Sequence, residues 1–503
     1  MFRADASPAI GGGHVHRCLA FAEWLSDAGW RCAFAFREPS LATVPALASS
    51  PHRLLQLDGE DSEEAAELLH DCGAPCELLV VDQYHRARDY ELQCRAIAKN
   101  IMVFDDLPSR AHDCDYLLDP TPGRRSSEYE SFVPQSCKRF VGSQYAVLRP
   151  RFVAARPAAI ARRKNATRPA AKVLVSIGMT DPKNLTSVVL DAIAQSALPI
   201  QVDVVLGSAA PHLTSVRDRM SSLGPAARLH IDAPDMAALM STAGIVIGSA
   251  GSSSFERCCL GLPALVVIAA DNQDDIGDAL VGAGAAEIIG TSEDLEPERV
   301  IKSLKKFYSD GEVRTKMSEA AAKLCDGRGG MRVLAVLAGS MATRDGRTVS
   351  LRMAEVSDSG ILLEWQRHPQ SRRFAHNPQI PTETEHQDWF EKTIADPART
   401  LLIVTEGQSP MGMLRLDRIE PGVRKVSILT APAHYRHGIA SAALALARRL
   451  YPVDALHADV LQDNEASHAL FQRAGYHKEN DGLYVSAARG PRFGTDNEPR
   501  YRH

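Results

Sequence analysis

The chain has 503 residues, of which 45% are hydrophobic and 24% charged, and its formal net charge at pH 7 is −5. This length allows two to four domains with sizeable cores, and the lack of long basic runs argues against nucleic acid or a membrane surface as a partner. The ten cysteines show no repeated metal-ligand spacing, no secretory signal is recognised, and no apolar run approaches the ~18 residues of a membrane span. We therefore expect a cytoplasmic enzyme without a metal ion.

Residues 1–154 alternate short apolar runs with helical patterns, which predicts a parallel sheet covered on both faces. The expected strands are Met1–Ala4, Arg31–Phe36, Glu77–Asp82, Ile101–Asp105 and Lys138–Val141. The first of them is short, so a start upstream of Met1 is left open. In open sheets of this kind ligands bind beyond the carboxyl ends of the strands, and polar clusters follow two of the predicted ends, at Asp82 and at Asp105-Asp106.

Three glycines, Gly11 to Gly13, follow the first predicted strand and precede an apolar helix. They allow the backbone to come close to a ligand at the mouth of the sheet. His14 stands at the start of that helix, where the dipole disfavours its charged form. The residue is therefore expected to be neutral near pH 7 and able to accept a proton. A capping or solvent-facing role is the alternative.

Residues 155–171 are basic and contain two prolines, which indicates an interdomain linker. The alternation then resumes over a second unit, residues 172–340. Its expected strands are Lys172–Ile177, Gln201–Leu206, Ala227–Ile231, Gly244–Ile247, Ala264–Ile268 and Ala286–Ile289, and a helical stretch from Leu295 to Cys325 closes it.

The segment Ser249 to Pro263 joins two of these strands through a small-residue turn and a helical pattern. A helix start of this kind suits a phosphate group, and Glu256 lies one turn further on, within reach of an attached ribose. This pattern suggests a nucleotide-diphosphate site. A well-capped turn in any doubly wound sheet is the alternative.

Two such units facing a cleft suggest two Rossmann-like halves in the glycosyltransferase-B arrangement, an α/β fold. Residues 1–330 resemble the UDP-2,4-diacetamido-2,4,6-trideoxy-β-L-altropyranose hydrolases of pseudaminic acid biosynthesis, and more distantly the UDP-GlcNAc glycosyltransferase that makes lipid II. The matching blocks, in order, are Arg3-Ala4-Asp5, Ile10 to Leu19, Val81 to Tyr84, Phe104 to Asp106, Gly178 to Asn184, Ser249 to Pro263 and Asn272-Gln273. Met179-Thr180 departs from the two small residues that many members carry.

The resemblance implies hydrolysis of a UDP-sugar with inversion, with His14 as the base that activates water. Glu256 would bind the uridine ribose, and Ser252 and Ser253 would hold the diphosphate. The remaining substrate contacts that it implies are Gly13, Arg17, Tyr84, Asn184 and Asn272.

A Gly- and Arg-rich stretch, residues 326–347, suggests a boundary near residue 345, followed by a third domain at residues 348–486 and a tail at 487–503. The order of strands and helices in this domain resembles the GCN5-related N-acetyltransferases. That resemblance implies acetyl-CoA as cosubstrate, with its pyrophosphate in a cradle of Arg436, His437, Gly438, Ile439 and Ala440 and a further contact from Asn464. The alternative for Asn464 is a helix cap.

Phe471 stands where the acetyltransferase family often has a tyrosine as general acid, so Tyr476, Tyr484 or a water is expected in that role. Together the resemblances imply one chain that N-acetylates a UDP-4-amino-4,6-dideoxy sugar and then hydrolyses the UDP-diacetamido product. A glycosyltransferase with an accessory acetyltransferase is one alternative, and an acetyltransferase whose front half senses a nucleotide sugar is another. Sugars of related nonulosonic acid pathways also stay open.

Overall fold

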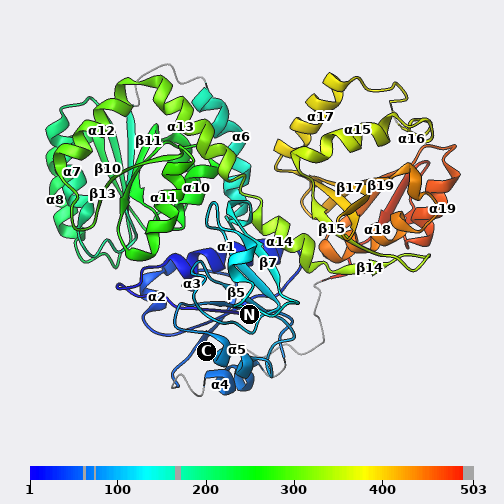
Figure 1. Cartoon of the computed structure of the whole chain (residues 1–503), viewed down its shortest axis with the longest axis horizontal. Coiled ribbons are helices and arrows are strands. Elements are labelled where there is room, and N and C mark those ends of the chain that lie inside the picture. Colours follow the sequence, from blue (N-terminus) through cyan, green and yellow to red (C-terminus); the bar gives the residue numbers. More distant parts are fainter. Residues whose placement is uncertain (60–63, 73–74, 165–170, 376, 491–503) are drawn as a thin grey trace. The chain divides into compact units, whose positions relative to one another are not determined.

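The computed structural model describes residues 1–59, 64–72, 75–164, 171–375 and 377–490. It contains three sheets (Figure 1). Two of them belong to one compact unit that extends to Gly330, and the third belongs to a second unit that contains Met331 onward. The predicted α/β class, with two Rossmann-like parallel sheets followed by an acetyltransferase-like mixed sheet, is confirmed.

The first sheet is entirely parallel, in the order β3-β2-β1-β4-β5-β6-β7. Its strands are β1 (Phe2–Ala4), β2 (Ala33–Phe36), β3 (Arg53–Gln56), β4 (Leu79–Asp82), β5 (Ile101–Phe104), β6 (Tyr116–Asp119) and β7 (Lys138–Val141). The sequence did not predict β3 or β6. β3 is an edge strand with one buried residue, so it lacks a clear apolar pattern, and the apolar run of β6 is only three residues long.

The short strand β1 lies inside this sheet, between β2 and β4, where Phe2 pairs with Phe34 of β2 and with Val80 of β4. Pairing on both sides compensates for its length of three residues. The helices of this half include α1 (Gly13–Asp27), α2 (Ser40–Thr43), α3 (Pro45–Ala48), α4 (Glu64–Cys72) and α5 (Arg88–Cys94). Helix α1 follows β1 directly, so the glycine turn predicted to approach a ligand lies at the carboxyl edge of the sheet.

A buried ionic cluster ties β1 to the helices of the same half. Glu64, whose side chain is fully buried, accepts hydrogen bonds from Arg3 Nε at 2.7 Å, Arg86 Nη2 at 2.7 Å and Tyr90 Oη at 2.7 Å. Arg37 Nη2 adds a fourth donor at 3.1 Å. Burial by itself would raise the pKa of Glu64, but these donors lower it to about 2, so the carboxylate is charged at neutral pH.

The second sheet is also parallel and has the order β10-β9-β8-β11-β12-β13. Its strands are β8 (Lys172–Ser176), β9 (Gln201–Leu206), β10 (Ala227–Ile231), β11 (Ile245–Ser249), β12 (Ala264–Ile268) and β13 (Ala286–Thr291). All six were predicted, most of them as short apolar runs and β10 as an alternation of apolar and polar residues. The helices that follow are α7 (Leu185–Ser196), α8 (Leu213–Leu223), α9 (Met236–Thr242), α10 (Ser253–Cys259), α11 (Asp274–Gly282), α12 (Pro297–Ser309) and α13 (Gly311–Leu324).

Two expectations for this half need correction. The predicted linker 155–171 begins inside helix α6 (Pro150–Lys164), and residues 165–170 lie outside the described part of the chain. The basic residues mislead here because Arg156 is bonded to the backbone, donating to the carbonyls of Cys259, Ala322 and Cys325. The single helical stretch expected over 295–325 is two helices, because the Asp310 carboxylate caps α13 by accepting from Glu312 N and Val313 N.

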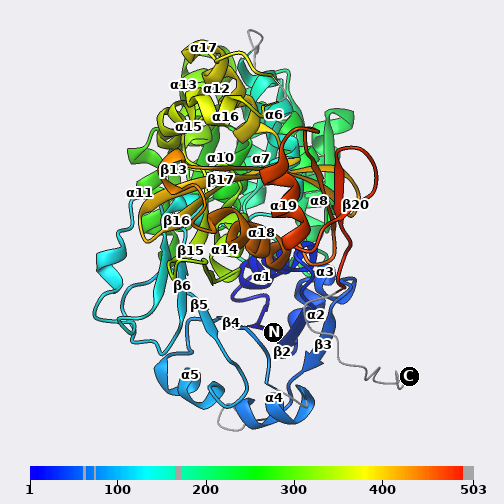
Figure 2. The ribbon, with the colours of Figure 1, turned by 90° about the vertical axis from the view of Figure 1, so that its right-hand side faces the viewer.

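The third sheet is mixed, in the order β14-β15-β16-β17-β18-β19-β21-β20, with β18 and β19 parallel. Its strands are β14 (Ser340–Ala342), β15 (Thr348–Met353), β16 (Arg399–Glu406), β17 (Ser409–Glu420), β18 (Val423–Thr430), β19 (Ala455–Asp459), β20 (His477–Lys478) and β21 (Leu483–Ser486). Helices α15 (Ser359–Arg367), α16 (Pro369–Arg372) and α17 (Glu383–Ala395) lie together on one face, while α18 (Ile439–Leu450) lies on the other beside α19 (Glu465–Arg473) (Figures 1 and 2).

The expected boundary near residue 345 is too late in the chain. Helix α14 (Gly329–Leu337) leads into β14, which pairs antiparallel with β15 through Ser340 and Ser350. Of the glycines that suggested a linker, Gly346 lies in the turn of this hairpin with a φ of 86°, whereas Gly329 and Gly330 lie in the first turn of α14. Residues 331–347 therefore belong with the third sheet. Among the described residues, no helix combines the length and apolar composition needed to cross a membrane.

Replacing Glu64 with alanine is expected to lower the free energy of unfolding by about 3–5 kcal/mol, because it leaves the buried Arg3 guanidinium without its main partner. Chemical denaturation of the full chain measures the change. Glu77→Ala, which removes an exposed pair with Lys99, should cost at most about 1 kcal/mol. Because the pKa of Glu64 is lowered, its contribution should be present above about pH 4.5 and lost as the pH falls towards about 2. Equal effects of the two substitutions would contradict this assignment.

Candidate functional site

The glycine turn after β1 places His14 against the end of β4. His14 Nδ1 lies 2.6 Å from Asp82 Oδ1, and the Asp82 side chain is fully buried while that of His14 is 14% exposed. A carboxylate at this nitrogen accepts a hydrogen bond from Nδ1–H, which leaves Nε2 unprotonated in the neutral ring. Nε2 has no hydrogen-bond partner among the described residues, so it is available to a bound molecule.

Arg17, one turn further along α1, binds the same carboxylate. Its Nε and Nη2 lie 2.6 Å from Asp82 Oδ2 and Oδ1, and its Nη1 reaches Asp106 Oδ2 at 3.2 Å. Burial alone would raise the pKa of Asp82, but Arg17 and His14 hold it well below its usual range. The site therefore contains a permanently ionised carboxylate behind the histidine. The Arg17 side chain, which we expected to contact substrate, is occupied by these two aspartates.

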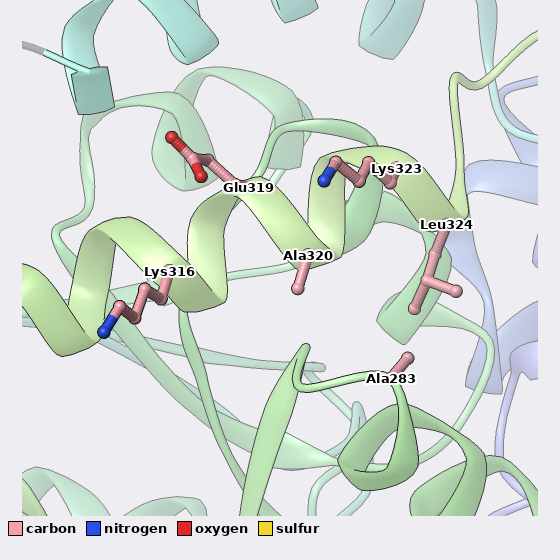
Figure 3. A pocket seen from close by; sticks show the side chains of 6 residues that line it. All are labelled: Ala283, Lys316, Glu319, Ala320, Lys323 and Leu324. Atoms are coloured by element: carbon pink, nitrogen blue, oxygen red, sulfur yellow. The ribbon is translucent and has the colours of Figure 1, made fainter.

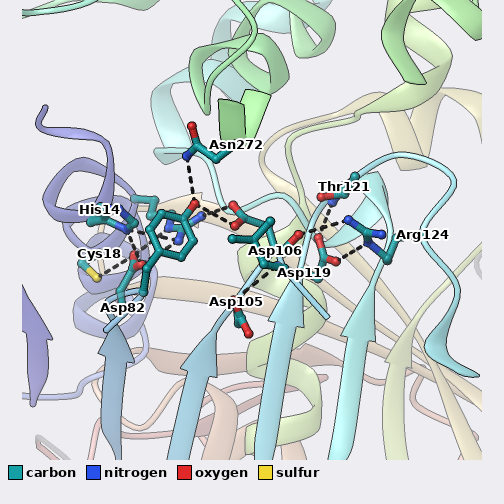
Figure 4. Close-up of polar contacts among 12 residues, drawn as sticks. His14, Cys18, Asp82, Asp105, Asp106, Asp119, Thr121, Arg124 and Asn272 are labelled. Atoms are coloured by element: carbon teal, nitrogen blue, oxygen red, sulfur yellow. Dashed lines mark hydrogen bonds and ion pairs between the residues drawn. The ribbon is translucent and has the colours of Figure 1, made fainter. Parts of the chain in front are cut away.

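Tyr84 continues the cluster beyond the end of β4. Its hydroxyl donates to Asp106 Oδ1 at 2.8 Å, and its ring packs edge-on against that of His14, with 5.0 Å between centroids. Burial, and next the Asp106 charge, raise the pKa of Tyr84 well above its usual value. Asp82 and Asp119 are the last residues of β4 and β6, and Asp105 directly follows β5, which lies between these strands (Figure 4). The site therefore follows the rule that ligands bind beyond the carboxyl ends of parallel strands.

The second sheet contributes residues to the same cluster. Asn272 Nδ2 donates to the Tyr84 hydroxyl at 3.1 Å (Figure 4), and a Cβ added to Gly13 would lie 3.6 Å from Ser252 Oγ. The structure thus brings together predicted residues that lie far apart in the chain, with Tyr84 and Asn272 separated by 188 residues. Arg124, at 2.8 Å from Asp275, makes a further link between the two halves.

Met179 accounts for the loop that departs from the family pattern. Its Sδ lies 2.8 Å from His16 Nε2 and 3.4 Å from the position of a Cβ on Gly12. Burial, with Arg149 nearby, lowers the pKa of His16 to about 4, so the ring is neutral. The Met179 side chain, which is larger than the small residue of the family pattern, therefore fills space beside the glycine turn.

Asn184 is placed less directly than the other predicted contacts. It adopts a left-handed conformation with φ 56° at the start of α7, and its Oδ1 accepts from Ser187 Oγ at 2.7 Å. Its described hydrogen bonds stay within this helix start, and none joins it to the His14 cluster. Its role as a substrate contact remains a prediction.

The turn after β11 presents Ser252 and Ser253 at the start of α10, with Glu256 one turn later. Burial raises the pKa of Glu256 to about 7, against the opposing effects of Arg149, Arg257 and Arg151. The carboxyl group has no hydrogen bond or ion pair among the described residues. A poorly solvated carboxyl group without a protein partner is suited to accept hydrogen bonds from a ligand.

The partners that order the strand-end aspartates had no separate signal in the sequence. His112 is fully buried between Glu91, at 2.7 Å, and Asp105, at 2.9 Å; burial lowers its pKa, but the two carboxylates raise it to about 9. Arg124 Nε similarly binds Asp119 at 2.9 Å. Asp82 and Asp105-Asp106 were predicted as strand-end residues and Asp119 was not, whereas the partners of these aspartates come from segments that only the folded chain brings near.

A separate surface depression of about 320 Å³ lies between α13 and the end of α11 (Figure 3). Its lining residues are Ala283, Lys316, Glu319, Ala320, Lys323 and Leu324. They include no nucleophile or proton-transfer group beyond an exposed glutamate and two lysines, so we assign no function to this depression. Among the described residues, no group of three or more His, Cys, Asp and Glu side chains is arranged to hold a metal ion.

The second unit contains the loop predicted to hold coenzyme A. Arg436 and Gly438 have positive φ angles of 69° and 88°, and α18 begins at Ile439. Successive turns of this kind direct backbone N–H groups to one side and form an anion-binding concavity, so the backbone present fits a pyrophosphate. His437 Nδ1 lies 2.7 Å from Asp345 Oδ2, so a hairpin residue before the predicted domain also contacts this loop.

Asn464 caps α19, because its Oδ1 accepts from Ser467 N at 3.1 Å. The structure thus places it in the alternative role, and a contact with coenzyme A stays a prediction. Phe471 is buried against Tyr476 and Tyr484, at centroid distances of 5.1 and 5.9 Å. The Tyr484 hydroxyl pairs with His468 Nδ1 at 2.9 Å, and burial raises the pKa of Tyr476 to about 12. Both hydroxyls lie in buried side chains.

Comparison with known proteins agrees with these two units. Residues 172–327 match the model of the glycosyltransferase family 28 C-terminal domain, and residues 348–477 match that of the acetyltransferase (GNAT) domain. The chain therefore carries a nucleotide-sugar-related domain and an acetyltransferase domain, whose cosubstrate is acetyl-CoA.

Three relatives extend the comparison. The spore coat polysaccharide biosynthesis protein SpsG of Bacillus subtilis is 26% identical over 66% of this chain and 96% of its own. The UDP-2,4-diacetamido-2,4,6-trideoxy-beta-L-altropyranose hydrolase of Campylobacter jejuni is 28% identical over 56% of this chain and 96% of its own. An uncharacterized protein of Methanocaldococcus jannaschii is 20% identical over 95% of this chain and 98% of its own. The chain is thus a distant homologue of the hydrolase.

The free energy of unfolding of Glu256→Gln, measured relative to that of the original chain, is expected to increase as the pH rises from about 4.5 to about 7. The folded protein holds the Glu256 proton to a higher pH than the unfolded chain does, so the acid loses stability over this window and the amide does not. Urea unfolding at pH 5 and pH 8 measures the difference. Glu319→Gln, at an exposed position of α13, serves as the control. A stability difference for Glu256→Gln that does not change with pH would contradict the assignment.

Proposed function

We propose that the chain is a bifunctional nucleotide-sugar enzyme. Its second unit N-acetylates a UDP-4-amino-4,6-dideoxy sugar with acetyl-CoA. Its first unit hydrolyses the resulting UDP-2,4-diacetamido-2,4,6-trideoxy-β-L-altropyranose to free sugar and UDP, with inversion at the anomeric carbon. The distant homology to the Campylobacter jejuni hydrolase and the acetyltransferase domain support this assignment.

The observation that carries the proposal is the pairing of His14 with the buried carboxylate of Asp82. In the hydrolytic step His14 Nε2 accepts a proton from water as the water oxygen bonds to the anomeric carbon. The bond from that carbon to the β-phosphate oxygen breaks, and its electron pair leaves with UDP. Asp82 holds the ring in the tautomer that exposes Nε2 and stabilises the imidazolium that forms.

The leaving nucleotide is assigned to the second sheet. Ser252 and Ser253 present a turn to the diphosphate, and Glu256 accepts from the ribose hydroxyls. The 3.6 Å separation between Ser252 Oγ and the Cβ position of Gly13 supports a site shared by the two turns. Tyr84 and Asn272, which bond to one another, are assigned to the sugar.

In the acetylation step the 4-amino group attacks the thioester carbonyl of acetyl-CoA, the amine loses a proton, and the coenzyme leaves as a thiolate that is then protonated. Residues Arg436 to Ala440 are assigned to the pyrophosphate through their backbone. Such a direct transfer depends mainly on holding the amine close to the thioester carbonyl in the correct orientation.

The two reactions suit one another chemically, because the acetylated nucleotide sugar formed in the first is the substrate of the second. The full-length relative from Methanocaldococcus jannaschii supports the two-part arrangement. The match to a glycosyltransferase family 28 domain favours one alternative, in which the sugar passes to an acceptor rather than to water. Release of UDP only after an acceptor sugar is added would favour that alternative and contradict hydrolysis.

Incubation of the full chain with the synthetic diacetamido UDP-sugar is expected to release UDP and free sugar in equal amounts without an acceptor. NMR of the first-formed anomer tests for inversion. His14→Ala should lower kcat by roughly 10²–10⁴-fold, because the base that takes the water proton is lost. A rate unaffected by this change would remove the assigned base.

Asp82→Asn provides a matched test of the same dyad, because it keeps the size of the side chain and removes its charge. It should lower kcat by at least about tenfold with KM nearly unchanged, because the amide cannot stabilise the imidazolium. Circular dichroism checks that the variant is folded. A rise in KM with kcat preserved would instead place Asp82 in substrate binding.

Gly438→Val should weaken binding of coenzyme A at least about tenfold, because a Cβ there would lie 2.8 Å from Arg344 N in a conformation with φ 88°. Isothermal titration calorimetry measures this affinity. The variant should fail to acetylate the UDP-4-amino sugar while still hydrolysing the diacetamido substrate. His14→Ala should show the reverse pattern, so that acetylated nucleotide sugar accumulates. Loss of both reactions in either variant would contradict separate sites.

A further inference from the structure

Arg257 is a buried cation without a carboxylate partner. Its residue is 2% exposed, and it forms no ion pair with any described residue. Two of its nitrogens, Nε and Nη1, are buried and have no hydrogen-bond acceptor. Because burying a charge is costly unless it is compensated, this arrangement requires an explanation.

The guanidinium lies beneath the turn that follows β11. Its Nη2 donates at 2.5 Å to the carbonyl oxygen of Ser249 and at 2.5 Å to Ser254 Oγ. Gly248, at the end of the strand, leaves room for it, because a Cβ at that position would overlap Nη1. Arg257 therefore supports residues 249–254 from the inner side.

Other buried arginines of the first unit are compensated differently. Arg3 and Arg17 bind carboxylates. Arg163 uses both terminal nitrogens on backbone carbonyls, including Met240 and Ala243 at the end of α9. Arg257 donates to one backbone carbonyl and one hydroxyl. It retains its charge, since arginine stays protonated in proteins. The neighbouring Glu256 forms no ion pair with it.

We propose that Arg257 is a positioning residue for the diphosphate: it fixes the turn at residues 249–254 and supplies from beneath it the positive charge that the two phosphates compensate. This inference rests on the proposed function, which assigns the UDP diphosphate to that turn. The guanidinium acts through the turn, and the phosphates contact the turn itself. The charge also opposes the negative charge that UDP gains as it leaves.

The test compares the affinity of the full chain for UDP with its affinity for uridine, measured by calorimetry. Arg257→Met should weaken UDP binding by on the order of tenfold or more, with uridine affinity nearly unchanged because uridine has no phosphate. Arg163→Met, which removes a buried arginine elsewhere in the same half, should leave the ratio of the two affinities unchanged even where it lowers stability.

Arg257→Lys covers the case in which the methionine variant does not fold. It keeps the charge, so the ratio of UDP to uridine affinity should stay within about threefold of the original. A tenfold fall in that ratio for lysine, or an unchanged ratio for methionine, overturns the inference while leaving the proposed function intact. An original chain that binds neither UDP nor uridine overturns the proposed function, and this inference with it.

Discussion

The buried carboxylate of Asp82 imposes most of the arrangement around the first strand ends. It sits at the end of a central strand, where a negative charge is tolerated only with donors around it. Asp82 accepts two hydrogen bonds from Arg17, whose third nitrogen donates to Asp106, and His14 Nδ1 lies 2.6 Å from the same carboxylate. The same bonds that compensate the charge also hold the histidine ring, whose Nε2 has no hydrogen-bond partner among the described residues. The stability of these strand ends and the orientation of His14, the proposed base, therefore both depend on the Asp82 carboxylate.

In both parallel sheets the strand order reverses beside the first strand, between β1 and β4 in one sheet and between β8 and β11 in the other. Such a reversal leaves a crevice at the carboxyl edge, and the two crevices are filled differently. The first holds ionised side chains that bond to one another, and the second holds a turn of small residues above a buried arginine. This difference suits a division in which one half acts on water and the other receives an anion. The bond between Asn272 and Tyr84 joins them.

Local sequence patterns were sufficient for much of this fold. Every strand of the second sheet was predicted from apolar runs or from alternation of apolar and polar residues, and His14 was singled out by the glycines before it. The contacts of Asp82 and Asp106 were not predictable, because they depend on which strands become neighbours. Local composition also misled in two places. The arginines of α6 suggested a solvated linker although Arg156 binds helix-end carbonyls. The glycines of residues 326–347 suggested a boundary although Gly329 and Gly330 begin α14 and Gly346 lies in a hairpin turn.

Glu256 and Arg257 show why a binding turn need not be the most stable one available. They are adjacent in sequence, opposite in charge and unpaired with one another. Burial raises the pKa of Glu256 to about 7 and lowers the pKa of Arg257 to about 10, so each is held in surroundings that disfavour its charge. In our proposal Glu256 accepts hydrogen bonds from the ribose and Arg257 supports the turn that receives the diphosphate, and an ion pair between the two side chains would interfere with both roles. Binding of the proposed UDP ligand would offset part of the cost of these two charges, so we expect some of its affinity to come from strain already present in the fold.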